Sequence, residues 1–209
     1  MEIVEAVVIA GAGIAGLATA LALKGVGVLA LVLERSYGLR ATGAALTLFP
    51  NAWLALDALY VSHKPTSKTN PMMGSVTNVR TGLIQDISLS GTEWLNAVPR
   101  SVHRKVLLET LANELPKDTI RFSSKLATIE SQAQEAGSPI AIIHLEDKTV
   151  IKAKVLIGCD EVHAVVAHWL GIAPAVHSGR SAVRGFSVFP QGHGMQEVQQ
   201  FVDLGKRVG

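Results

Sequence analysis

Five glycines interrupt an almost wholly apolar stretch near the start of the chain, and this pattern restricts the fold more than any other feature. The stretch runs from Ala6 to Arg35 and reads AVVIAGAGIAGLATALALKGVGVLALVLER. It is long enough for a membrane span, which needs about 20 apolar residues in one helix. Its composition, however, changes from a β-branched run to a glycine turn, a helix-forming run, a second turn and another apolar run. Because buried parallel strands are continuously apolar, the sequence predicts a strand–turn–helix–turn–strand unit and no transmembrane segment.

The first turn of this unit matches the pattern G-x-G-x-x-G, with glycines at Gly11, Gly13 and Gly16. We call residues 11–16 the glycine loop. In dinucleotide-binding proteins the first glycine permits the tight turn, the second lets the backbone approach a pyrophosphate, and the third lets helix and strand pack closely. The pyrophosphate is then expected at the positive end of a helix that begins near Ile14. We therefore include Ile14 and Ala15 among the candidate cofactor-binding residues.

An acidic residue closes the second predicted strand. Glu34 follows Gly16 at close to the ~20-residue spacing at which an acidic side chain reaches a ribose hydroxyl. Glycine loop, strands and acid together predict dinucleotide binding, without choosing between NAD, NADP and FAD. The neighbouring Arg35 could accept a 2′-phosphate, cover an adenine or be a solvated charge at the strand end, and we favour the last of these.

Two later segments contribute further candidates. Ser101 is expected to cap a helix that ends before Pro116. Arg104 lies at the edge of the apolar stripe of that helix, where its guanidinium could reach water or face the cofactor. The run KVLIGCD predicts a buried strand followed by a helix-like segment, and Asp160 lies at its carboxyl end, where α/β sheets bind ligands. Asp160 could bind the cofactor or act as an ordinary helix N-cap.

Composition excludes several other classes of protein. The 209 residues are 48% hydrophobic and 17% charged, which favours a globular chain over a disordered one. A net charge of +2 spread along the sequence gives no electrostatic footprint for nucleic acid. The seven histidines form no metal-ligating constellation, so no metal is expected. The single cysteine, Cys159, is typical of a reducing compartment, and no positively charged segment of a secretory signal precedes the first apolar run. We expect an intracellular soluble protein, in the cytoplasm or alternatively in a plastid.

Four separated motifs carry a resemblance to a known family. They are VVIAGAGIAGLATALAL with LVLER, LRATGAAL, VPRSVHRKVLLETL and KVLIGCDEVHAVVAHWLG. In this order they resemble the FAD-dependent aromatic-hydroxylase (class A) family of flavoprotein monooxygenases, in particular its plant branch near salicylate hydroxylase and zeaxanthin epoxidase. The resemblance implies an α/β fold: a Rossmann-like FAD-binding domain of the glutathione-reductase type with part of a substrate-binding β-sheet domain. It also implies FAD as cofactor, NAD(P)H as co-substrate, and O2 and a small organic molecule as substrates.

The resemblance assigns roles to individual residues. It implies that the glycine loop binds the pyrophosphate of FAD and that Glu34 binds the ribose of its adenosine. Arg40 and Arg104 match family arginines that face the cofactor. Asp160 matches the aspartate of an Asp-Gly fingerprint that is linked to binding of both FAD and NAD(P)H. The implied domains are residues 1–73 and 100–175 for FAD binding, and residues 74–99 and 176–209 for an incomplete substrate-binding sheet.

Two departures from the family pattern stand out. Glu161 replaces the glycine of the Asp-Gly fingerprint, and the later Gly-Asp motif that completes the flavin pocket is not in the sequence. We therefore expect a truncated form of a monooxygenase, for which no catalytic acid or base is assigned. The alternatives are a non-catalytic fragment that binds FAD or ADP, or a module that depends on a partner or self-associates through exposed sheet edges. Another type of FAD-dependent oxidoreductase is a third alternative, against which the GCD segment weighs.

Overall fold

The chain forms two compact units in the computed structural model. The first contains Met1–Gly43 and Lys105–Ser181, and the second contains Ala44–Arg104 and Ala182–Gly209. The structure describes residues 2–40, 45–66, 73–88, 99–133, 138–162, 164–181, 183, 187–192 and 198–208. The domain boundaries given above stay predictions.

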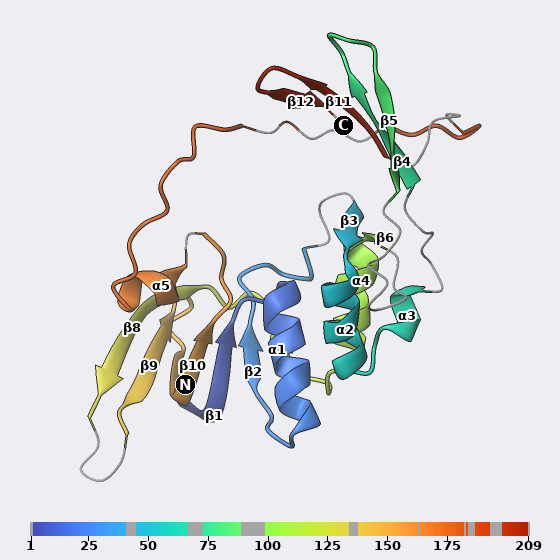
Figure 1. Cartoon of the computed structure of the whole chain (residues 1–209). Helices are drawn as coiled ribbons and strands as arrows, with labels where there is room; N and C mark the ends of the chain where they lie inside the picture. Colours follow the sequence, from blue (N-terminus) through green and yellow to red (C-terminus); the bar gives the residue numbers. More distant parts are fainter. Residues whose placement is uncertain are drawn as a thin grey trace. The chain divides into compact units, whose positions relative to one another are not determined.

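A six-stranded sheet forms the centre of the first unit (Figure 1). Its strands lie in the order β7-β2-β1-β10-β9-β8. The first four of these are parallel to one another, and β10, β9 and β8 are antiparallel neighbours. The bounds are β1 Glu2–Ala10, β2 Leu31–Leu33, β7 Ile120–Arg121, β8 Leu126–Gln132, β9 Ile140–Leu145 and β10 Val150–Gly158. The carboxyl ends of the parallel strands therefore meet at one edge of the sheet.

The first unit also contains the helices α1 (Ile14–Gly25) and α5 (Val165–Trp169) and all but the first residue of α4 (Arg104–Asn113). α1 packs against β1 and β2, and α5 packs against β8 and β10. The core consists of aliphatic side chains of the strands and helices, among them Val8, Ile9, Leu17, Leu33, Ile143 and Ile151. The predicted α/β class is confirmed, and so is the strand–turn–helix–turn–strand unit, although its second strand is only three residues long.

The predicted helix cap at Ser101 is wrong. Ser101 lies within β6 (Arg100–His103), which pairs antiparallel with β3 (Ala45–Leu48) so that Ser101 lies opposite Thr47. Pairing with a distant strand has overridden the local capping preference of serine. The helix α4 begins only after this strand, and it buries Leu107, Leu108 and Leu111.

The second unit contains a separate four-stranded sheet in the order β12-β11-β4-β5. Its strands β4 and β5 pair antiparallel and are joined by a turn that contains Arg80, Thr81 and Gly82. Gly82 has a φ of +69°, a left-handed conformation that glycine adopts without strain. The remaining bounds are α2 Pro50–Ala58, α3 His63–Thr66, β4 Met73–Asn78, β5 Ile84–Ser88, β11 Val198–Asp203 and β12 Lys206–Val208.

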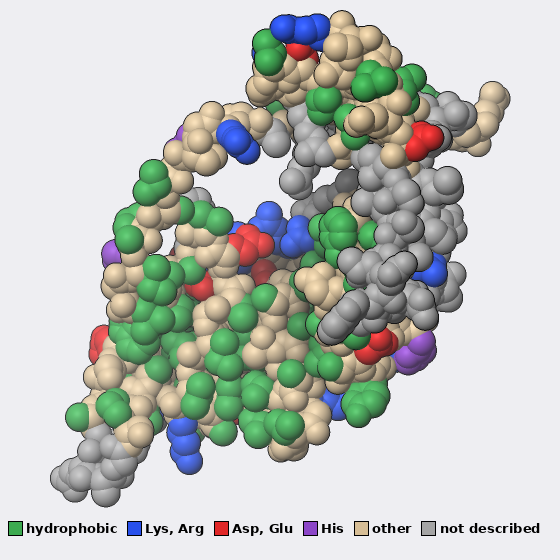
Figure 2. Space-filling model, viewed as in Figure 1, with side chains coloured by type: hydrophobic (Ala, Val, Ile, Leu, Met, Phe, Trp, Pro, Cys, Tyr) green, Lys and Arg blue, Asp and Glu red, His purple; other side chains and the backbone are tan. Residues whose placement is uncertain are grey.

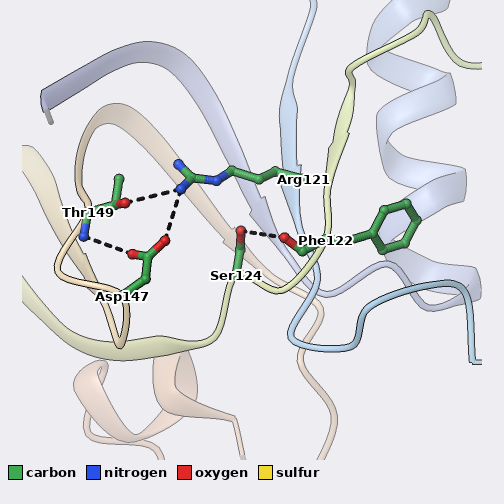
Figure 3. Close-up of polar contacts among 5 residues, drawn as sticks. All are labelled: Arg121, Phe122, Ser124, Asp147 and Thr149. Atoms are coloured by element: carbon green, nitrogen blue, oxygen red, sulfur yellow. Dashed lines mark hydrogen bonds and ion pairs between the residues drawn. The ribbon is translucent and has the colours of Figure 1, made fainter.

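Polar contacts fix the β9–β10 turn to the end of β7 in the first unit (Figure 3). One nitrogen of the Arg121 guanidinium donates to the carboxylate of Asp147 and to the hydroxyl of Thr149, both at 3.1 Å. The amide of Thr149 donates to the other oxygen of Asp147 at 2.8 Å. These contacts join segments that are far apart in the sequence. None of the helices in the described ranges is long and apolar enough to cross a membrane.

Candidate functional site

Gly11 and Gly16 allow three pieces of backbone to meet at the carboxyl ends of β1 and β10. Gly11 has a φ of +102°, and a Cβ atom on it would overlap the carbonyl oxygen of Cys159. A Cβ atom on Gly16 would overlap the carbonyl oxygen of Gly11. Both overlaps are closer than 3.0 Å, which real Cβ atoms essentially never show. Only glycine fits at these two positions, as the motif predicts.

Gly13 has a different environment. It is the N-cap residue of α1, with an extended backbone (φ −74°, ψ −179°), and no heavy atom lies within 4 Å of a Cβ atom built on it. The fold would therefore accept a side chain there, but that side chain would fill the open space in front of the helix. The first turn of α1 contains no acidic residue, and its amides have no intrahelical acceptors. This open, electropositive helix end fits an anionic group such as a pyrophosphate, beside the half-buried Ile14 and the exposed Ala15.

Glu34 lies directly after β2 and is buried, with 9% of its surface exposed. Its Oε2 accepts the amide N–H of Ala12 in the glycine loop at 3.0 Å, and its Oε1 accepts the amide N–H of Ser36 at 2.9 Å. The structure thus brings Glu34 and the glycine loop together. Each carboxylate oxygen can accept a second hydrogen bond, so a ribose contact is compatible with this geometry and stays a prediction.

Asp160 follows β10 and contacts the start of α5. Its Oδ2 accepts the amides of Val165 at 2.8 Å and Val166 at 3.5 Å. Asp160 therefore satisfies helix amides as a cap would, although the N-cap residue by backbone geometry is Ala164. The second oxygen, Oδ1, is buried without a hydrogen-bond partner among the described residues. A role in cofactor binding stays a prediction.

Glu161 adopts the conformation that its family counterpart, glycine, would favour. Its φ is +69°, in the left-handed region, which costs an L-residue roughly 1–2 kcal/mol. Its side chain is exposed. Glycine adopts this conformation without that cost, and the replacement adds a carboxylate beside Asp160.

The three candidate arginines differ in how exposed their side chains are. Arg35 follows Glu34 and is exposed, and so is Arg40. Arg104 is the first residue of α4 and is half-buried. Their cofactor contacts stay predictions. Within the part of the chain that the structure describes, no group of three or more histidine, cysteine or acidic residues could hold a metal ion.

Sequence reasoning missed the structural role of Cys159. Its backbone carbonyl abuts Gly11, and its amide donates to the carbonyl of Ala10 at 2.8 Å. Burial raises the pKa of its thiol, while a hydrogen bond with Thr19 acts in the opposite direction. Cys159 lies beside Gly11 because the strand register pairs Ala10 with Gly158. This register cannot be predicted from the local sequence.

Comparison with known proteins identifies the family. The FAD binding domain family matches residues 5–202. Monooxygenase 2 of Arabidopsis thaliana is 42% identical over 97% of this chain and 49% of its own length. Monooxygenase 1 of the same plant is 39% identical over 92% of this chain and 47% of its own. The chain thus spans about half the length of these relatives.

The fold also matches solved structures. The structure of Klebsiella pneumoniae HpxO complexed with FAD and uric acid superposes with a TM-score of 0.69, at 23% identity, over 82% of this chain and 43% of HpxO. The p-nitrophenol 4-monooxygenase PnpA from Pseudomonas putida gives a TM-score of 0.68 at 21% identity, over 82% of this chain and 44% of PnpA. These matches agree with the predicted Rossmann-like fold class. With its glycine loop, parallel sheet and sequence match, the chain belongs to the FAD binding domain family, the family of the FAD-dependent class A monooxygenases.

Proposed function

We propose that the first unit binds the adenosine diphosphate half of FAD, and that the protein is a FAD-dependent monooxygenase. In this proposal NAD(P)H and O2 are co-substrates, and a small organic molecule is hydroxylated or epoxidised. The observation that carries the proposal is the open space at Gly13, in front of α1, inside a loop whose other two glycines are sterically required. When bound, FAD supplies the redox and oxygen-transfer chemistry, while the protein binds, orients and excludes water.

The residues around α1 would hold the adenosine diphosphate. The pyrophosphate lies against Gly13 and the amides of Ile14 and Ala15, where the helix dipole favours an anion. The remaining acceptor positions of Glu34 receive the ribose hydroxyls. Arg35 is exposed beside Glu34, where its guanidinium can cover the adenine or remain solvated.

Three further residues would act on the cofactor or on NAD(P)H. Asp160 lies at the carboxyl end of β10, where α/β sheets bind ligands. Arg40 and Arg104 match family arginines that face the cofactor, to which they would supply positive charge. No side chain is proposed as the catalytic acid or base.

The decisive experiment is an absorbance spectrum of the 209-residue protein after incubation with FAD and desalting. We expect retained flavin bands at close to one FAD per chain. Gly13→Ala should lose them, and Gly25→Ala, at the far end of the same helix, should keep them. A colourless but folded wild-type protein would contradict binding of FAD by this chain. Where FAD is retained, oxidation of NADH and NADPH with and without candidate aromatic substrates tests the monooxygenase activity.

A second candidate function is a non-catalytic module that needs a partner or a second copy. Val4 on β1 and Val155 on β10 are 71% and 48% exposed, and Figure 2 shows hydrophobic side chains gathered over the six-stranded sheet and α1. Apolar surface of this kind favours association, as do the edge strands β7 and β8. Concentration-dependent sedimentation that is abolished by the Val4→Ser/Val155→Ser double variant would support self-association; a monomer at all concentrations would oppose it.

We also propose an intracellular location, in the cytoplasm or in a plastid. The lone cysteine, which is free, supports a reducing compartment. A fluorescent fusion of the complete gene product distinguishes the two sites, and a secreted fusion would contradict both.

A further inference from the structure

Glu34 links two backbone segments at the edge of the sheet where the glycine loop lies. Oε2 of its carboxylate accepts the amide of Ala12 at 3.0 Å, and Oε1 accepts the amide of Ser36 at 2.9 Å. Ala12 lies between the first two glycines of the motif, whereas Ser36 lies in the chain that leaves β2. The side chain of Glu34 therefore fixes the position of the glycine loop relative to the end of β2.

The amide of Ala12 needs an acceptor at this point because the strand ladder has ended. The amide of Gly11 still donates to the carbonyl of Leu33 at 2.8 Å, which extends the pairing of β1 with β2 by one residue. Ala12 is buried, with 5% of its surface exposed, so water is a poor substitute. A buried amide without an acceptor is unfavourable, and the carboxylate of Glu34 takes the place that a strand carbonyl would otherwise have.

The same contacts account for the burial of Glu34. A carboxylate with 9% exposure is tolerated only when hydrogen bonds compensate for lost hydration. Hydrogen bonds from amides to a charged oxygen are stronger than neutral ones. The backbone of Glu34 is held as well, because its amide donates to the carbonyl of Arg121 at 2.9 Å and its carbonyl accepts the amide of Ser124 at 2.8 Å. The carboxylate is thus presented to Ala12 from a rigid position.

We propose that Glu34 is a positioning residue that sets the glycine loop in its binding conformation before a dinucleotide arrives. This inference rests on the proposed function and adds a second role to a ribose contact: Glu34 acts on the pyrophosphate site through Ala12. The two roles are compatible because each oxygen keeps one acceptor position. The two roles can be separated with a ligand that lacks the ribose hydroxyls. With such a ligand, a substitution of Glu34 still lowers the affinity if Glu34 positions the loop, and has no effect on the affinity if Glu34 only binds the ribose.

Glu34→Gln is the informative variant. An amide side chain has one acceptor oxygen, and its NH2 group must face the amide of either Ala12 or Ser36. One of these two hydrogen bonds is therefore lost, and the NH2 group of the glutamine then faces a backbone N–H that is also a donor. Glu109→Gln is the matched control, because it makes the same chemical change on an exposed position of α4 in the same unit.

The binding test uses calorimetry with ADP and with 2′,3′-dideoxy-ADP, which lacks both ribose hydroxyls. For a positioning residue, Glu34→Gln weakens binding of dideoxy-ADP by about tenfold or more and binding of ADP by at least the same factor, and Glu109→Gln leaves both unchanged. If the loss with ADP disappears with the dideoxy ligand, Glu34 acts only as a ribose ligand and the inference is overturned.

Hydrogen exchange in the ligand-free protein tests the contact without reference to binding. We expect the Ala12 amide of the wild type to exchange about as slowly as the Gly11 amide, and much faster in Glu34→Gln. A rapidly exchanging Ala12 amide in the wild type would overturn the inference even if the variant failed to fold. Failure of the wild type to bind either nucleotide would instead contradict the proposed function and leave the exchange result to decide the role of Glu34.

Discussion

The Cα atom of Gly16 in α1 packs directly against the carbonyl oxygen of Gly11 at the end of β1, leaving no room for a Cβ atom between them. This contact sets how closely the helix approaches the strand, because α1 also packs on β1 and β2. It also holds the start of the helix beside the turn that precedes it. Substitutions at Gly16 and at Gly13 should therefore have different consequences.

Gly16→Ala should destabilise the protein although alanine favours helices. The methyl group must displace backbone, and overpacking of this kind costs typically about 1–3 kcal/mol, more than the ~1 kcal/mol that alanine gains in a helix. Urea unfolding measures the difference. Gly25→Ala in the same helix, where no heavy atom lies within 4 Å of the added Cβ, should be neutral or stabilising. Equal stability of Gly16→Ala and wild type would contradict the packing described here.

Gly13→Ala should separate binding from folding. The added methyl group enters open space, and the backbone of Gly13 is one that alanine adopts readily. We expect the free energy of unfolding to change by less than about 0.5 kcal/mol, whereas ADP binding measured by calorimetry should weaken at least about tenfold if the pyrophosphate approaches this backbone. Unchanged ADP affinity would place the pyrophosphate elsewhere.

Sequence predicts those features of this site that depend on residues close together in the chain, and it does not predict those that depend on pairing of distant strands. The roles of Gly11, Gly13 and Gly16 follow from a six-residue pattern, and the position of Glu34 follows from the length of one strand–helix–strand unit. The contact between Gly11 and Cys159 requires the parallel pairing of β1 with β10, which are far apart in the chain, so no local pattern reports it.

The same distinction explains the error at Ser101. A serine before an apolar periodic run is a reasonable helix cap, but the pairing of Ser101 with Thr47 is a tertiary interaction that the local pattern does not contain. Asp160 is an intermediate case. Its place at a strand end is visible in the sequence, whereas its contact with amides five and six residues later depends on the path of the loop.

Glu161→Gly should stabilise the protein and strengthen binding of ADP. Glycine relieves the left-handed strain at φ +69°, although it costs entropy in the unfolded chain, so we expect a net gain of up to about 1 kcal/mol. Lys148→Gly is the matched control, since Lys148 has a φ of +67° in the β9–β10 turn. Both variants should raise the melting temperature, but only Glu161→Gly removes a negative charge beside Asp160. A similar change in ADP affinity in both variants would contradict a specific effect of the Glu161 charge.

Acid should weaken the attachment of the β9–β10 turn to β7. Hydrogen bonds from the amide and hydroxyl of Thr149, together with the Arg121 guanidinium, lower the pKa of Asp147 below its usual value. A lowered pKa means that the stabilisation is present above the unfolded-state pKa of about 3.9 and is lost as pH falls through the folded-state value. The melting temperature of wild type should therefore exceed that of Asp147→Asn at pH 6, and this difference should shrink below about pH 4. A difference that does not depend on pH would show that the charge of Asp147 is not involved.

Cys159 should react slowly with thiol reagents in the folded protein. Burial raises the pKa of its thiol, and because the thiolate is the nucleophile, alkylation by iodoacetamide at pH 8 should be several-fold slower than in the denatured chain. A raised pKa also means that folding favours the protonated thiol. The associated stabilisation is complete below the unfolded-state pKa of about 8.5 and declines as pH rises toward the folded-state value. Wild type should therefore lose stability relative to Cys159→Ser between pH 7.5 and pH 10. Alkylation at the denatured rate would contradict partial burial of this thiol.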